Sequence, residues 1–405
     1  MEAQPYSHRA RLRAIPGSIW ALGFVSLLMD VSSEMIHALL PVYLVTVLGT
    51  SLTTVGLIEG IAEATASITR VFSGALSDWM RNRKLLAVLG YGLAALSKPI
   101  FPLASAVSWV VAARFIDRMG KGIRGAPRDA LVADLAPVAL RGASFGLRQA
   151  LDTVGAFLGP LLAMLFMWLT ADAFRIVFWI AVLPAFLSLA LIVFAVREPA
   201  RPTALHKVRF PLHRDELARL GKRYWLLIAV TTVFTLARFS EAFLVLRAQA
   251  AGVSVMFVPG VLVLMNAVYA LAAYPAGAMA DRAGRRIVFV IGVALLVLAD
   301  LVLAGASSVS AAALGVALWG LHMGFTQGVL ATLVTDMTPA ELRGTAFGVF
   351  NLITGLALLA ASVIAGFLWD RIGAQAMFLT GALLAAIALA GLLLTRNDLD
   401  QSNVE

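Results

Sequence analysis

The sequence contains no cysteine and few charged residues. Without cysteine, the chain of 405 residues has no disulfide framework, no thiolate metal site and no dithiol redox motif. Charged residues make up 14% of the chain and hydrophobic residues 60%. A soluble globular domain typically carries about 25% charged residues, so the composition excludes that class. It predicts a protein that crosses a membrane several times.

Signatures of soluble catalysis are also missing. The five histidines, His8, His37, His206, His213 and His322, have no metal-ligand spacing. The glycine-rich segment 119–125 lacks the spacing of a nucleotide-binding P-loop and falls within an apolar stretch. We therefore expect no metal, no cofactor and no enzymatic activity, and we do not expect ATP to be the direct source of energy.

Long apolar stretches dominate the chain. A membrane-spanning helix takes about 20 apolar residues, and the chain has room for twelve once a central polar segment is set aside. The stretch from Ser18 is too long, and with Asp30 and Glu34 too acidic, for a cleaved signal peptide. The expected fold class is an all-α membrane protein with twelve transmembrane helices.

Lysine and arginine are unevenly distributed between the loops. If both termini lie on one side, that side holds 20 of the 32 lysines and arginines, and the other side holds Arg175 and Arg371. Because these residues favour the cytoplasmic side, we expect both termini to be cytoplasmic in a multi-pass protein of the plasma (inner) membrane. The net charge of +9 is then a topology signal in a protein that contacts the lipid bilayer and binds no nucleic acid.

Two segments of the chain recur at almost constant spacing. Gly74-Ala-Leu-Ser-Asp78, followed by basic residues, returns as Gly277-Ala-Met-Ala-Asp281 at an offset of 203. Asp134-x-x-Pro137-x-x-x-Arg141-Gly142 returns as Asp336-x-x-Pro339-x-x-x-Arg343-Gly344 at an offset of 202. The repeat predicts two pseudo-symmetric six-helix bundles, residues 1–196 and 224–405, joined by a cytoplasmic linker at 197–223.

These repeated segments resemble the major facilitator superfamily of secondary transporters, and the likeness covers essentially the whole chain. The Gly-x-x-x-Asp segment followed by basic residues is similar to the loop signature of that superfamily. The second copy, Asp281-Arg282-Ala283-Gly284-Arg285-Arg286, is closer to it than the first, which has Trp79 and Arg81 at the corresponding places. The resemblance implies alternating access between two bundles, a small-molecule substrate and a monomeric protein.

The duplicated charges at the helix ends predict a gate. An aspartate at the cytoplasmic end of one helix can bind an arginine, or the free N-terminal amides, of a neighbouring helix. We expect such a latch from the following residues: Asp78, Arg141, Asp281, Arg282 and Arg343. The other interpretation is that these charges only anchor loops and set the topology.

A segment in the fifth span bears on the direction of transport. Gly155-Ala-Phe-Leu-Gly159-Pro160 is similar to the Gly-x-x-x-Gly-Pro segment of proton-driven exporters in the superfamily, although residues 161–163 lack the further glycines of that pattern. Glycines four residues apart let two helices approach closely, and the proline introduces a kink. The resemblance implies export, while close packing of membrane helices alone is the other interpretation.

The fourth span has charged side chains on one face. It contains these residues: Arg114, Asp117, Arg118, Lys121, Arg124, Arg128 and Asp129. At about 100° per residue they fall within an arc of roughly 140°. A cation at the bilayer centre costs about 2.5–3.5 kcal/mol, so this face must line a wet cavity or meet partners on other helices. A structural network of buried ion pairs is the alternative to a binding site.

We assign two roles to the charged residues within the spans. The candidates for binding an anionic group, which arginine contacts in bidentate fashion, are Arg114, Arg118, Lys121, Arg124, Arg148 and Arg238. The candidates for proton exchange are Asp30, Glu34, Asp117 and Glu241. If protons and an anion compete for these cations, the protein is a proton-coupled exporter of a small anionic or amphiphilic organic solute. The alternatives are proton-coupled uptake of an organic anion and a receptor that does not transport.

Overall fold

The computed structural model describes residues 14–80, 82–137, 140–197, 217, 219–338 and 342–394, without the side chains at 74, 75, 78–80, 281, 331, 343 and 344. Within these ranges the regular structure is helical and contains no strand. The first half of the chain forms α2 (Gly17–Thr46), α3 (Leu52–Met80), α4 (Arg83–Ser97), α5 (Ile100–Leu103), α6 (Val107–Leu135), α7 (Arg141–Leu169) and α8 (Phe174–Ala195). The second half forms α10 (Lys222–Ala237), α11 (Ala242–Ala250), η2 (Val255–Phe257), α12 (Gly260–Ala283), α13 (Arg285–Ala304), α14 (Val309–Asp336), α15 (Arg343–Arg371) and α16 (Ala374–Leu394).

Most of these helices are suited to a membrane. Among the described residues, ten spans are long and apolar enough to cross one, and α3 and α6 are the two further long helices. Both carry ionisable residues along their length, which suits helices whose polar side chains meet protein or water rather than lipid. When α4 is counted with α5 and α10 with α11, the described residues form the twelve expected helices. The predicted all-α membrane fold is confirmed.

Two of the spans are interrupted. α4 and α5 meet at Lys98, where Pro99 has no amide hydrogen with which to continue the helix. Residues 238–241 separate α10 from α11, and there the amide of Ser240 donates to the Ser362 hydroxyl at 3.2 Å instead of to a helical carbonyl. Non-helical backbone at membrane depth is tolerated where protein covers it or where it lines a water-filled cavity. The interruptions are therefore places where polar groups enter the interior.

The chain divides into two compact units. The first comprises Met1–His37, Thr69–Phe166 and Ala173–Arg209, and the second comprises Ala38–Ile68, Met167–Asp172 and Phe210–Glu405. The dividing points fall inside α2 and α3, so each of these helices belongs partly to each unit. The bundles at 1–196 and 224–405, with a linker at 197–223, describe the repeat in the sequence and stay a prediction.

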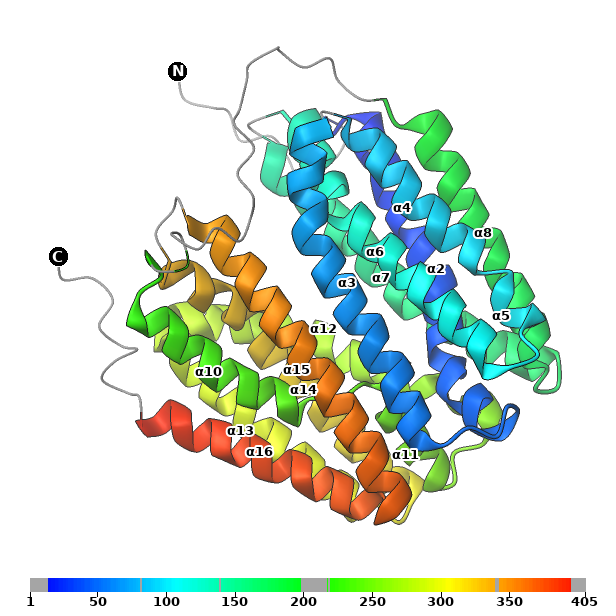
Figure 1. The fold of residues 1–405 in the computed structure, drawn as a ribbon, viewed down its shortest axis with the longest axis vertical. Coiled ribbons are helices and arrows are strands. Elements are labelled where there is room, and N and C mark those ends of the chain that lie inside the picture. The colour runs from blue at the N-terminus through cyan, green and yellow to red at the C-terminus, as the bar shows by residue number, and fades with distance from the viewer. Residues whose placement is uncertain are drawn as a thin grey trace. The chain divides into compact units, whose positions relative to one another are not determined.

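Glycines bring helices of the first unit into close contact. In Figure 1, α4 packs against α6 and α8. A Cβ atom added to Gly90 of α4 would lie 2.7 Å from the backbone nitrogen of Arg124 and 2.7 Å from the carbonyl oxygen of Gly120, both in α6. Such distances are shorter than van der Waals contact, so the backbones of α4 and α6 meet only because these positions lack side chains.

In the second unit, α3 begins against the end of α15. The amides of Leu52 and Thr53 donate to the two carboxylate oxygens of Asp370 at 3.0 and 2.7 Å, and the Thr53 hydroxyl donates to the same group at 2.6 Å. A Cβ atom added to Gly56 would lie 2.0 Å from the carbonyl oxygen of Ser362. A side chain of α15 therefore caps the first turn of α3, and the two helices touch along their backbones.

Candidate functional site

A buried ion pair links α6 to the interruption between α4 and α5. The ammonium group of Lys98 lies 2.8 Å from Asp117 Oδ1 and donates to the Ser33 hydroxyl of α2 at 2.9 Å. The side chains of Lys98 and Asp117 are only 1% and 3% exposed. Arg114 and Arg118, both buried, also act electrostatically on the Asp117 carboxylate. Asp117 thus lies among cations rather than facing solvent.

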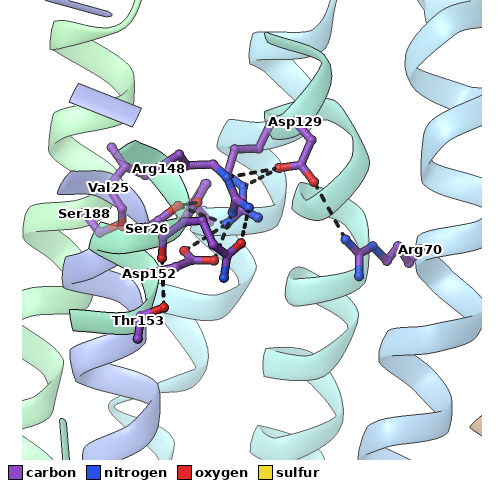
Figure 2. A network of polar contacts seen from close by, with 11 residues as sticks. Val25, Ser26, Arg70, Asp129, Arg148, Asp152, Thr153 and Ser188 are labelled. Atoms are coloured by element: carbon purple, nitrogen blue, oxygen red, sulfur yellow. Dashed lines mark hydrogen bonds and ion pairs between the residues drawn. The ribbon is translucent and has the colours of Figure 1, made fainter. Parts of the chain in front are cut away.

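Three arginines and two aspartates form a second cluster, which Figure 2 shows from close by. Asp129 of α6 contacts Arg128 at 3.2 Å, Arg148 of α7 at 3.7 Å and Arg70 of α3 at 3.7 Å. Asp152 of α7 contacts Arg148 at 2.9 Å and Arg128 at 3.5 Å. In Figure 2, Arg70 and Arg148 approach Asp129 from opposite sides. The cluster therefore ties α6 to both α3 and α7.

Two further cations of α6 have different surroundings. The guanidinium carbon of Arg124 lies 4.8 Å from the centre of the Tyr91 ring in α4, which is a cation–π contact. Arg124 is buried, and its Nη1 atom has no hydrogen-bond partner among the described residues. Lys121, almost one turn earlier, is exposed. Arg124 thus keeps a free hydrogen-bond donor in the interior, and Lys121 is accessible from outside.

Two half-buried carboxyls of α2 lie within electrostatic reach of these cations. Lys121 and Arg124 both act on Asp30, and Lys121 also acts on Glu34. Glu34 Oε2 lies 3.3 Å from His37 Nδ1 one turn further along α2. We call Asp30, Glu34, Lys121 and Arg124 the α2–α6 cluster. It unites two predicted proton-exchange residues with two predicted anion-binding residues.

Two glycines of α7 bring that helix against the same part of α2. A Cβ atom added to Gly155 would lie 3.1 Å from the Cβ of Asp30, and one added to Gly159 would lie 2.6 Å from the Cβ of Glu34. A larger side chain at either position would push α7 away from α2. The Gly-x-x-x-Gly-Pro segment therefore lies directly against the part of α2 that carries Asp30 and Glu34.

The second unit holds the other two predicted site residues, Arg238 and Glu241. They occupy the interruption between α10 and α11. The guanidinium carbon of Arg238 lies 5.7 Å from the centre of the Phe234 ring, and the side chains of Glu241 and Tyr269 act on it electrostatically. Arg238 is thus the cation at the interruption between α10 and α11, whereas the site residues of the first unit include several cations.

The helix ends carry an ion pair that is present in both halves of the chain. Arg83 Nη1, at the start of α4, lies 2.8 Å from Asp134 at the end of α6. Arg285, at the start of α13, pairs with Asp336 at the end of α14. The second pair follows the first by 202 positions at both residues. The repeat in the sequence thus returns in the structure as the same contact.

The residues predicted to form a latch are described only in part. Arg141 and Arg282 are exposed. The side chains of Asp78, Asp281 and Arg343 lie outside the described residues. The latch among these five residues therefore stays a prediction.

Lys98 and Arg70 are not among the site residues predicted from the sequence. Their partners lie on other helices, so periodicity along one helix does not reveal them. A signal was nevertheless present, because a lysine inside an apolar span needs a counter-charge. Among the described residues, no group of three or more His, Asp or Glu side chains is placed to hold a metal ion.

Comparison with known proteins identifies the family. The model of the Major Facilitator Superfamily matches residues 22–268 and 242–405. The uncharacterized MFS-type transporter MJ1317 of Methanocaldococcus jannaschii is 36% identical over 390 residues, which cover 94% of this chain and 95% of that protein. The inner membrane transport protein YajR of Escherichia coli is 26% identical over 388 residues, which cover 91% and 81%. A solved POT family transporter in complex with a thioalcohol-conjugated peptide has a TM-score of 0.79 at 14% identity and covers 96% of this chain and 100% of its own. The chain belongs to the Major Facilitator Superfamily and is a multi-pass secondary transporter.

Proposed function

We propose that this transporter moves a small anionic or amphiphilic organic solute together with protons, as a monomer in the plasma (inner) membrane with both termini in the cytoplasm. The observation that carries the proposal is the α2–α6 cluster. In it, Lys121 and Arg124 lie within reach of Asp30, and Lys121 also acts on Glu34. A proton binds to a carboxyl, an anion binds to a cation, and the two events share one set of electrostatic interactions.

The sign of the coupling follows from which group each ligand binds. In the empty cluster, ionised carboxyls attract the two cations. Protons that neutralise Asp30 and Glu34 weaken this attraction and leave Lys121 and Arg124 to contact an anionic group. By linkage, a bound anion then favours proton binding in return. The sequence led us to expect that protons and the solute compete, which would require both to bind the same group. In the proposed cluster, protons bind the carboxyls and the solute binds the cations. The cluster therefore favours co-transport in one direction, which is uptake along an inward proton gradient.

Proton-driven export is the second candidate, and it is supported by a different observation. Gly155 and Gly159, in the segment similar to that of exporters, pack against Asp30 and Glu34 of α2. A solute group that bound these carboxyls directly, such as the cationic end of an amphiphile, would compete with protons. Export requires that competition.

Alternating access requires contacts that hold a state and can be broken. The helix-end pairs Arg83–Asp134 and Arg285–Asp336 brace α4 against α6 and α13 against α14. The Asp370 carboxylate holds the first turn of α3. We propose that the predicted latch among Asp78, Arg141, Asp281, Arg282 and Arg343 acts beside the two helix-end pairs.

Proteoliposomes test the proposal. The purified protein is reconstituted with a pH-sensitive dye inside the vesicles, and small organic carboxylates are added, each with its neutral amide as a control. We expect carboxylate and protons to enter together. Lys121→Ala should lower carboxylate flux about tenfold, since a hydrogen bond to a charged group contributes about 1.5–3 kcal/mol. Lys222→Ala changes an exposed lysine at the start of α10 and should leave the flux unaltered.

The same vesicles separate the candidates. Protons and solute that move in opposite directions would establish export. Flux that ignores both the pH gradient and Lys121→Ala would contradict coupled transport through this cluster. Glu34→Gln, which removes one proton-binding group, should preserve exchange of solute for solute while lowering the response to pH. An unaltered response would remove Glu34 from the mechanism.

A further inference from the structure

Asp300 lies in the interior of the second unit, where the described residues provide no ion-pair partner for it. Its side chain, on α13, is 0% exposed. Neither of its carboxyl oxygens has a hydrogen-bond partner among the described residues. An isolated ionised carboxylate in apolar surroundings is very costly, and such a group becomes neutral instead. Burial without a partner therefore favours the neutral, protonated form of Asp300 over the carboxylate.

The sequence repeat shows how unusual this position is. At the offset of 202 that relates the two helix-end ion pairs, Asp300 takes the place of Lys98, and Trp319 takes the place of Asp117. In the first half of the chain, these positions form the buried Lys98–Asp117 pair. In the second half, one of them is an acid and the other is an indole. The counter-charge present in the first half has no equivalent here.

Gly381 lies beside the carboxyl group of Asp300, next to a group of aromatic rings. A Cβ atom added to Gly381 of α16 would lie 2.7 Å from Asp300 Oδ2 and 3.1 Å from the Phe239 ring. The Phe239 ring packs on Trp319 at a centroid distance of 5.0 Å, and Trp319 packs on His322 at 5.9 Å. Trp319 Nε1 and His322 Nε2 are buried and, among the described residues, have no hydrogen-bond partner. We call Asp300, Trp319 and His322 the Asp300 cluster.

Trp319 and His322 provide the two kinds of hydrogen-bonding atom that a carboxyl group needs, a donor for its ionised form and an acceptor for its protonated form. His322 Nδ1 lies 3.2 Å from the carbonyl oxygen of Gly292 and must donate to it, which leaves Nε2 as an acceptor in the neutral ring. The Trp319 indole can only donate. The cluster therefore contains an acceptor suited to the protonated acid and a donor suited to the carboxylate.

The charged groups on neighbouring elements have other contacts. Arg247 of α11 donates to two carbonyl oxygens at the end of α13, at 2.8 and 3.3 Å. Arg238 interacts with Glu241 and with Tyr269 of α12, and its charge also reaches His322. Helix α16 has no ionisable residue between Ala374 and Leu394. His322 is linked to this region through Trp319, which packs on the Phe239 ring beside Gly381.

We propose that Asp300 is a second proton-binding site of this transporter, separate from the α2–α6 cluster. A proton delivered by water binds the carboxylate to form the neutral acid. On release the proton returns to water and leaves the carboxylate. The role of this site in transport rests on the proton coupling proposed above, whereas the existence of the bound proton does not.

Infrared spectroscopy of the full-length protein in lipid vesicles tests this proposal without a solute. A protonated carboxylic acid has a carbonyl stretching band that a carboxylate lacks. We expect such a band in the wild-type protein at neutral pH, its loss in Asp300→Asn and its return at a shifted frequency in Asp300→Glu. After transfer to D2O the band should shift as the proton exchanges. Trp319→Phe and His322→Phe, which remove the two unpartnered buried nitrogens of the Asp300 cluster, should slow that shift.

Three outcomes overturn the proposal. If Asp300→Asn removes no acid band at any pH at which the protein is folded, Asp300 is ionised and paired. If the band never shifts in D2O, the acid is a sealed structural group. If Gly391→Ala, a change on α16 with an ordinary 3.7 Å contact, alters the band as much as Gly381→Ala, the carboxyl does not lie where the structure places it. If solute flux is independent of the proton gradient while the Asp300 band still shifts in D2O, the proposed proton coupling is wrong and the proton-binding site at Asp300 stands.

Discussion

The interiors of the two halves of this transporter accommodate a buried ionisable residue in different ways. In the first half, Lys98 and Asp117 are both buried and neutralise each other at 2.8 Å. At the corresponding positions of the second half, Asp300 is buried and has no hydrogen-bond partner among the described residues, and Trp319 takes the place of Asp117. The helix-end pairs do not differ in this way, because Arg83–Asp134 returns as Arg285–Asp336. The repeat has preserved the chemistry of the helix ends and exchanged that of the interior.

The difference teaches that pairing and protonation are two routes to burying a charged residue. A pair is neutral at every pH at which both partners are ionised. Removing one partner strongly destabilises the protein, because the other charge is left buried and uncompensated. A lone acid is neutral only while it holds its proton. The first half is therefore expected to be sensitive to mutation of either partner, and the second half to pH.

The largest effect is expected from breaking the buried pair. Lys98→Met leaves Asp117 buried without its ammonium partner and should lower the free energy of unfolding by about 3–5 kcal/mol. The double variant Lys98→Met/Asp117→Leu should recover part of this loss, because Arg114 and Arg118 also lose the Asp117 carboxylate. Thermal unfolding of the purified protein in detergent, with Lys222→Met as the control, measures both. If the double variant is no more stable than the single one, the pair stabilises the protein through specific interactions and not only by neutralising two buried charges.

The matching change in the second half should have the opposite sign. Asp300→Val replaces a buried acid that has no hydrogen-bond partner among the described residues with an apolar side chain of similar size. Because it removes an unsatisfied polar group, it should raise the free energy of unfolding by about 1–3 kcal/mol. The same unfolding measurement applies. A loss of stability as large as that of Lys98→Met would mean that Asp300 has a partner after all.

A smaller contrast is expected from the glycines beside the two positions. Gly90→Ala places a Cβ atom against the backbone of α6 and should destabilise by about 1–3 kcal/mol through overpacking. Gly381→Ala meets the end of the Asp300 side chain, which can turn away at about 0.5–1.5 kcal/mol. Unfolding midpoints of the two variants, each compared with Gly391→Ala, give the difference. Equal losses would show that the Asp300 carboxyl is as rigidly held as a helix backbone.

The smallest effects are expected where the two halves agree. Arg285→Gln removes a partly exposed ion pair and should cost about 0.2–1 kcal/mol. Arg83→Gln should cost somewhat more, because Arg83 is less exposed and also donates to the carbonyl of Ala130 at 3.0 Å. Raising the salt concentration should reduce both effects. An Arg285→Gln variant more affected than Arg83→Gln would contradict this ranking.

Much of the fold was predictable because membrane insertion constrains a sequence strongly. Apolar length predicted the twelve helices, and two recurring segments predicted a duplicated architecture. The site was less predictable. Helical periodicity placed Asp117 on the same face of α6 as the cations, but it could not predict that Lys98 binds Asp117. Lys98 directly follows α4, and its ammonium group donates to the Asp117 carboxylate. Asp300 is a single acid in an apolar span, which is unusual in itself, but only the structure shows that it has no hydrogen-bond partner among the described residues.

Figure 1 shows α3 early in the chain and α15 near its end, and their contact has a consequence for biosynthesis. The Asp370 carboxylate that caps α3 is 318 residues away from Leu52. At about 5–20 residues per second, a ribosome needs roughly 16–64 s to add it. Throughout that interval the newly inserted α3 has neither its cap nor the helix against which Gly56 packs. The membrane, or an insertion chaperone, must shelter this glycine-rich surface until synthesis is nearly complete.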